Sequence, residues 1–177
     1  YAEFSINEKV AMEVGIGSSF AGARTLVSMK HVGVNIAAYP LMTFTQTRTK
    51  GGFLFMSGDD PGMASSQNEQ DNRNVYQMAR LTVFEPAPPK EAYIYYKDAA
   101  AFAKKEQTAA VLRLTTHVCH AREKIRFDKF NPPPLFRNDF NRDNGPYIPL
   151  TSTALEMKAE AIRKLKQAQR SARTKQL

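Results

Sequence analysis

The sequence predicts an α/β fold: a mostly parallel sheet with helices on both faces. Short apolar runs, typical of strands buried on both faces, recur at residues 25–29, 52–57, 81–84 and 109–115. The segments between them have the apolar spacing of helices, and strands that alternate with helices indicate parallel βαβ units. Ligands gather at the carboxyl ends of the strands in such sheets. We therefore expect functional residues in the loops at 30–35, 58–71 and 116–122.

The expected helices follow from capping residues and apolar spacing. Residues 6–27 are expected to form a helix that runs into the first strand. Asn7 is its expected N-cap, because its short side chain can accept a hydrogen bond from a free backbone N–H. Glycines inside a helix are tolerated where another backbone packs closely, so the small residues between Gly15 and Ala23 predict a buried helix. Further helices are expected at 35–47, from Ser65 or Ser66 to Ala79, at 90–105 and at 154–169.

Length and cysteine content restrict the class of protein. The chain has 177 residues, enough for one domain with a hydrophobic core, and it begins at Tyr1 rather than Met. We therefore expect a processed, recombinant or partial form of a longer chain. Its single cysteine, Cys119, cannot form an internal disulfide, which favours a reducing compartment. There is neither an apolar run of the roughly 18 residues that span a bilayer nor a signal segment, so we expect a cytoplasmic protein.

Charge and proline content set the last third of the chain apart. Residues 158–177 are rich in Lys and Arg, which either attract a polyanion or form a solvated helix face. Aromatic residues are not interleaved with these basic residues, so a nucleic-acid partner is not expected. Five prolines among Asn and Asp are typical of a linker: Pro132, Pro133, Pro134, Pro146 and Pro149. The expected organisation is a partial domain at 1–125, a Pro-rich linker at 126–153 and a basic helical tail at 154–177.

Short catalytic motifs do not identify a reaction. The sequence has no CxxC, HExxH, GxSxG or GKS/T motif. The three histidines are too scattered to predict a metal site. His117 and Cys119 would point to one side if the strand continued, which indicates ordinary packing at a strand end. Gly15-x-Gly17 lies inside a helix and is not a dinucleotide-binding turn.

Three longer stretches carry a resemblance to a known family. They are NEKVAMEVGIGSSFAGARTLVSMKHVGVN at 7–35, DDPGMASSQNEQDNR at 59–73 and RLTTHVCH at 113–120. In this order and at this spacing they resemble the pyrimidine-binding domain of the alpha subunit of indolepyruvate ferredoxin oxidoreductases, which are thiamin-diphosphate-dependent 2-oxoacid:ferredoxin oxidoreductases. The resemblance covers about residues 1–125 and continues more weakly to the segment PYIPL.

The resemblance implies a reaction and a set of partners. Such an enzyme oxidises an arylpyruvate to an acyl-CoA, releases CO2 and passes electrons to ferredoxin. Thiamin diphosphate forms the carbanion and iron–sulfur clusters carry the electrons, while the protein supplies position and electrostatics. The implied partners are a beta subunit, the remaining alpha-subunit domains, ferredoxin, CoA and the 2-oxoacid, within an oligomer.

Glu8 is the catalytic residue that the resemblance implies. A glutamate at the start of the family's first helix contacts N1′ of the aminopyrimidine ring of the cofactor, and Glu8 stands at that position. A carboxylate against a ring nitrogen favours proton sharing, which drives the amino–imino shift of the cofactor. The alternative for Glu8 is a favourable negative charge at a helix N-terminus.

Two loops hold the other candidate site residues. By the resemblance, His31, Gly33 and Asn35 face cofactor and substrate: Gly33 allows close backbone approach, and His31 either donates to a substrate oxygen or caps the following helix. The second loop supplies hydrogen-bonding groups for substrate or for a subunit contact, with helix capping and solvated polar residues as the alternative. These residues are Ser65, Ser66, Gln67 and Gln70. Arg73 pairs with Asp71 or Glu69, or holds an anion.

Departures from the family pattern concern the substrate and the missing parts. No Gly-Asp-Gly motif is present, so Mg²⁺ and the diphosphate are expected to be bound by another domain or chain. The family's Gly-Thr-Pro-type loop and cysteine-rich cluster domain are also absent. Ala64 replaces a frequent His and Tyr39 a frequent Asp, so phenylpyruvate, phenylglyoxylate or a branched 2-oxoacid are alternative substrates. The competing hypothesis is a non-catalytic subunit-interface module derived from this family.

Overall fold

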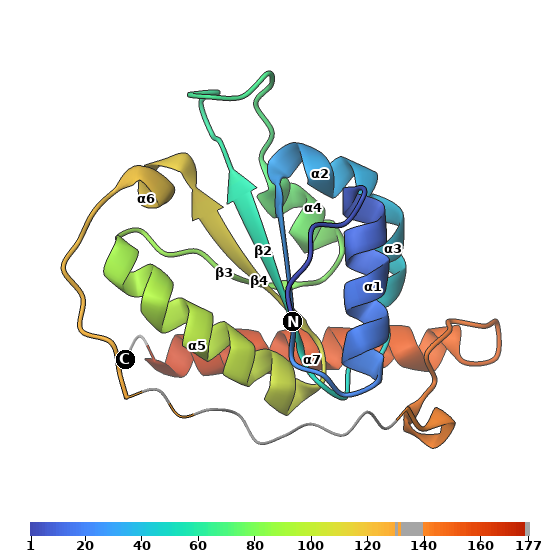
Figure 1. The fold of residues 1–177 in the computed structure, drawn as a ribbon. Coiled ribbons are helices and arrows are strands. Elements are labelled where there is room, and N and C mark those ends of the chain that lie inside the picture. Colours follow the sequence, from blue (N-terminus) through green and yellow to red (C-terminus); the bar gives the residue numbers. More distant parts are fainter. Residues whose placement is uncertain (130, 132–139, 176–177) are drawn as a thin grey trace.

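Four parallel strands form one sheet in the computed structural model, which describes residues 1–129, 131 and 140–175. The strands are β1 (Thr25–Lys30), β2 (Phe53–Asp59), β3 (Thr82–Phe84) and β4 (Ala109–Thr115). Their order in the sheet is β1-β2-β4-β3, and every neighbouring pair is parallel (Figure 1). The expected α/β fold class is therefore confirmed.

Helices cover both faces of the sheet because the central strands are apolar on both sides. Phe53 and Phe55 of β2 face one layer, and Leu54 between them faces the other. The first layer holds α1 (Glu8–Phe20), α2 (His31–Ile36), α3 (Ala38–Phe44) and α4 (Asn72–Met78). The second layer is α5 (Pro89–Glu106), whose Ala99 and Ala103 pack against Leu54.

Helix α1 begins and packs as the sequence predicts. Asn7 is its N-cap, with Oδ1 accepting a hydrogen bond from the backbone N–H of Val10 over 2.9 Å. A Cβ atom at Gly15 would lie 2.4 Å from Cγ2 of Val27, so the absent side chain lets α1 rest directly on β1. At Gly17 the same atom would meet nothing within 4 Å. Close packing is therefore confirmed for Gly15 but not for Gly17.

The expected helix at 35–47 is wrong in its boundaries. Helix α2 begins at His31, directly after β1, and the chain turns at Ala37 before α3. Pro40 explains the break, because proline has no N–H to donate to the carbonyl four residues earlier and its ring crowds that carbonyl. His31, Gly33 and Asn35 consequently lie on a short helix and not in the expected loop.

Two other segments differ from expectation. Helix α4 begins at Asn72, not near Ser65 or Ser66, and its N-cap is Asp71, which accepts from the backbone N–H of Arg73 over 3.1 Å. Strand β4 ends at Thr115, and residues beyond it form α6 (Thr116–His120). The strand therefore ends where the sequence predicts, and the difference is the helix α6 in place of the expected loop at 116–122.

The last described segment packs against the domain. It contains the 3₁₀ helix η1 (Arg142–Asn144) and α7 (Ala154–Lys175), which extends beyond the expected end at residue 169. The Tyr147 ring lies 4.7 Å from that of Phe20, centroid to centroid. Lys164, on the expected solvated face, is buried and donates to the Gln107 carbonyl over 3.0 Å. Pro132, Pro133 and Pro134 of the expected linker lie outside the described residues.

Candidate functional site

The carboxyl edge of the sheet gathers the segments that the sequence singles out. Figure 1 shows α2, the loop between β2 and α4, and α6 along the upper edge, where the strand arrows point. Helix α1 runs antiparallel to the strands, so its first residue, Glu8, also lies at this edge. Residues from four distant parts of the sequence are thus neighbours.

Glu8 lies across the bare backbone of Gly33. A Cβ atom on Gly33 would stand 2.5 Å from Cγ of Glu8 and 3.0 Å from its Oε1. No side chain larger than hydrogen fits there unless Glu8 moves. Glu8 is half-buried, and its side chain lies over α2 at the edge of the sheet. The structure thus brings together two of the residues that the resemblance assigns to the cofactor.

His31 is buried at the start of α2. Its Nε2 atom lies 3.2 Å from both the backbone oxygen and the side-chain Oδ1 of Asn68, and its Nδ1 has no partner. The imidazole therefore ties α2 to the loop between β2 and α4. Asn68 was not singled out in the sequence, although it lies inside the second family-like stretch.

Asn35 and Gln70 pair through their side-chain amides. Asn35 Nδ2 donates to Gln70 Oε1 over 2.8 Å, and Gln70 Nε2 donates back to Asn35 Oδ1 over 2.9 Å. Gln70 Nε2 also lies 3.2 Å from the His31 carbonyl oxygen, and Asn72 Nδ2 lies 3.3 Å from the same oxygen. The structure therefore joins the two predicted loops through Gln70.

Ser65 and Ser66 lie instead around Asp60. The carboxylate of Asp60 accepts from the backbone N–H groups of Ala64 over 3.1 Å and Ser65 over 2.7 Å, and from the Thr116 hydroxyl over 2.7 Å. The hydroxyls of Ser66 and Thr116, together with these backbone donors, hold the pKa of Asp60 well below its ordinary value. Gln67 is exposed to solvent.

A buried ion pair beneath the edge was not foreseen. Arg113 of β4 and Asp59 of β2 are almost fully buried, and Arg113 Nε lies 2.7 Å from Asp59 Oδ2. Arg113 Nη1 lies 2.5 Å from Oε1 of Glu85, and Asn72 Nδ2 lies 3.3 Å from Asp59 Oδ1. Each charge has hydrogen-bonding partners, as buried charges require. Arg73 pairs with Asp71 over 2.8 Å, one of the two alternatives open in the sequence.

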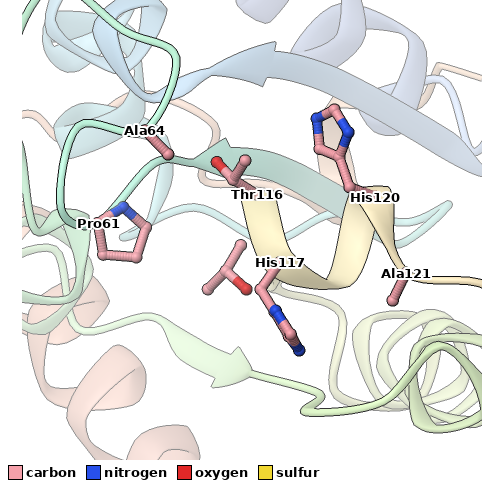
Figure 2. Close-up of a pocket in the computed structure, with 7 residues that line it drawn as sticks. Pro61, Ala64, Thr116, His117, His120 and Ala121 are labelled. Carbon is pink, nitrogen blue, oxygen red and sulfur yellow. The ribbon is translucent and has the colours of Figure 1, made fainter.

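A pocket of about 470 Å³ adjoins the Asp60 loop. Figure 2 shows Thr116 on the side of Ala64 and Pro61, and the rings of His117 and His120 pointing away from each other on α6. Within the described residues no group of three metal-ligating side chains comes together. No helix among them has the length and apolar character needed to cross a membrane.

The all-parallel sheet between two helical layers is the architecture of the pyrimidine-type domains of thiamin-diphosphate enzymes. No family model matches the chain. Over all of its 177 residues it is 37% identical to the indolepyruvate oxidoreductase subunit IorA of Methanothermobacter marburgensis, of which it covers 28%. It is 39% identical to IorA of Archaeoglobus fulgidus, with 96% of the chain and 27% of the relative covered. It is 43% identical to IorA of Thermococcus kodakarensis, with 71% of the chain and 19% of the relative covered.

The chain belongs to the family of indolepyruvate oxidoreductase IorA subunits. It spans just over a quarter of the length of the first of these relatives.

Proposed function

We propose that the chain is the pyrimidine-binding part of an oxidoreductase that oxidatively decarboxylates an arylpyruvate to an acyl-CoA. The observation that supports this most is the contact between Glu8 and Gly33 at the carboxyl edge of the sheet. A glutamate at the start of the first helix is what the family assigns to the pyrimidine ring, and Gly33 leaves room for that side chain. The relatives carry the name indolepyruvate oxidoreductase subunit, which supports the aryl 2-oxoacid as substrate and a complex with further subunits.

The residues present fit a thiamin diphosphate pyrimidine. When bound, the cofactor supplies the carbanion chemistry of decarboxylation. Glu8 would hold the aminopyrimidine ring through a ring nitrogen, and its carboxylate would share a proton there. Gly33 leaves room above α2 for the Glu8 side chain, and Asn35 belongs to the same helix. General acid–base catalysis by a positioned carboxylate contributes about a hundredfold or more to a rate.

The other members of the predicted site have distinct tasks in this proposal. His31, buried and bound to Asn68, orders the loop that borders the site rather than donating to substrate in this conformation. Ser65, Ser66 and Gln67 belong to the more exposed part of that loop, where substrate or another subunit approaches. Mg²⁺, the diphosphate, the iron–sulfur clusters, CoA and ferredoxin are bound by other domains and chains of a cytoplasmic complex.

A non-catalytic interface module is the second candidate, and exposed apolar side chains favour it. Leu26 on the edge strand β1, Ile36 on α2 and Tyr39 on α3 are 47%, 55% and 74% exposed. Exposed apolar side chains are typical of contacts between chains where they form a contiguous patch. A catalytic domain of a multi-subunit enzyme also needs such contacts, so activity decides between the two candidates.

The test is dye reduction by the full-length protein assembled with its partner subunit. Indolepyruvate, phenylpyruvate and pyruvate are compared, each with and without thiamin diphosphate, Mg²⁺ and CoA. We expect cofactor-dependent reduction with an aryl 2-oxoacid preferred over pyruvate. Absence of thiamin-dependent activity with every 2-oxoacid would overturn the proposal and leave the interface module.

A further inference from the structure

The paired amides of Asn35 and Gln70 join α2 to the loop between β2 and α4. Each amide gives one hydrogen bond and receives one, over 2.8 and 2.9 Å. The pair stands at the outer end of an inward series of contacts: Asn35 is exposed, Gln70 is half-buried and Asn72 is fully buried. Asn72 in turn contacts Asp59, the partner of buried Arg113. Helix α2 is thus connected through Gln70 and Asn72 to Asp59 and Arg113 on the central strands of the sheet.

The same series of contacts holds the first turn of α2. The carbonyl oxygen of His31 lies 3.2 Å from Gln70 Nε2 and 3.3 Å from Asn72 Nδ2. Helix α2 has only six residues, and its N-cap, Lys30, makes no side-chain capping bond. A helix of this length is not stable by itself and depends on such tertiary contacts. The position of its first turn therefore depends on the Gln70 amide.

Gly33 belongs to that turn and carries the contact with Glu8. We propose that Asn35 and Gln70 are positioning residues for Glu8, acting through α2 and the Gly33 backbone. This inference rests on the proposed function of Glu8. Gln70 is then not a substrate ligand, because its amide oxygen and nitrogen are both used within the chain.

Only amides satisfy this arrangement. Gln70 Nε2 faces three oxygen atoms, on Asn35, His31 and Asn72. A carboxylate at residue 70 would place acceptor against acceptor, and an unsatisfied polar contact of this kind is strongly unfavourable. Exchange of the two side-chain lengths, by Asn35→Gln with Gln70→Asn, keeps the amide pair but shortens the side chain that reaches the His31 carbonyl.

The test uses the full-length protein with its partner subunit, in which kcat, the KM values for 2-oxoacid and thiamin diphosphate, and thermal unfolding are measured. Gln70→Glu is expected to lower kcat by about tenfold to a hundredfold, the penalty of a misplaced catalytic group. Gln70→Asn alone is expected to lower it less, and Asn35→Gln with Gln70→Asn to recover only the part of kcat that depends on the amide pair. Gln77→Ala, exposed on α4, is the matched control and should behave as wild type.

The deciding measurement is Gln70→Glu in a Glu8→Gln background. If Gln70 acts through Glu8, the second substitution adds no further loss of kcat, whereas losses that multiply would overturn the inference. An unchanged kcat in Gln70→Glu would overturn it as well. Full activity in Glu8→Gln alone would instead overturn the proposed function. Where Gln70→Glu does not fold, Gln70→Asn and the exchanged pair carry the same comparison.

Discussion

Arg113 on β4 donates from Nε to Oδ2 of Asp59 on β2 over 2.7 Å, with both side chains removed from solvent. The two strands are neighbours in the sheet, although β3 and α5 lie between them in the sequence. Asp59 is the last residue of β2, where the loop towards Gln70 begins, so this pair supports the edge at which Glu8 and α2 lie.

Removal of Arg113 is expected to destabilise the carboxyl edge. Arg113→Met leaves Asp59 buried without its charge partner, which costs about 3–5 kcal/mol for a buried pair. Hydrogen exchange of the β2 and β4 amides in the full-length protein measures the local free energy of opening. Arg163→Met, which breaks an exposed pair with Glu160, is the control and should cost at most about 1 kcal/mol. Equal protection of the β2 and β4 amides in Arg113→Met and Arg163→Met would contradict a stabilising role of the Arg113–Asp59 pair at this edge.

Gly33→Ala and Gly17→Ala form a matched pair of substitutions on helices. Gly33→Ala pushes Glu8 from its place, and we expect thiamin-dependent kcat to fall by about tenfold or more. Gly17→Ala meets open space and removes a poor helix former, so the free energy of unfolding should rise by up to about 1 kcal/mol. Steady-state kinetics and thermal unfolding of the full-length protein distinguish the two. Wild-type kcat in Gly33→Ala would show that the contact is dispensable.

The stability that Asp60 contributes through its contacts with residues 64–66 and Thr116 should be lost at acidic pH. The hydroxyls of Ser66 and Thr116 and the N–H of Ser65 hold the pKa of folded Asp60 below its ordinary value near 3.8. The unfolded carboxyl takes up its proton at higher pH, so the stabilisation is complete above the ordinary pKa and is lost as pH falls towards the folded value. Thr116→Val removes one donor and should move the Asp60 titration, followed by NMR, to higher pH. An unchanged midpoint would exclude this contact as a cause.

Tyr147 is expected to anchor the segment before α7. Its ring packs on Phe20, and its hydroxyl donates to the Asn141 carbonyl over 3.1 Å. An aromatic pair contributes about 0.5–1.5 kcal/mol beyond its buried area. Tyr147→Ala should therefore speed protease cleavage within residues 140–153, whereas Tyr147→Phe should retain most of the protection. Equal cleavage of Tyr147→Ala and the wild type would contradict this packing.

The local sequence pattern was sufficient to predict the fold class and the start of the first helix. The runs at 53–57 and 109–114 are apolar on both sides, which requires helices on both faces of the sheet. Asn7 was recognisable because a cap acts within three residues of itself. The break before α3 was also present in the sequence, as Pro40, but the apolar spacing around it concealed the boundary.

The contacts that assemble the site lie beyond local pattern. Asp59 and Arg113 meet only because β2 and β4 are neighbours, and the sequence of neither strand predicts the order of strands in the sheet. His31 and Asn68 meet because the long loop folds back over α2. The family-like stretches contained all four residues, yet only the folded chain shows which of them touch.

The role of Glu8 is tested most directly by Glu8→Gln in the full-length protein with its partner subunit. Thiamin-dependent dye reduction with an aryl 2-oxoacid is the measurement, and Glu13→Gln, exposed on the same helix, is the control. We predict that Glu8→Gln lowers kcat by about a hundredfold or more while Glu13→Gln retains it. Equal activity of the two variants would contradict the assignment of Glu8 to the cofactor.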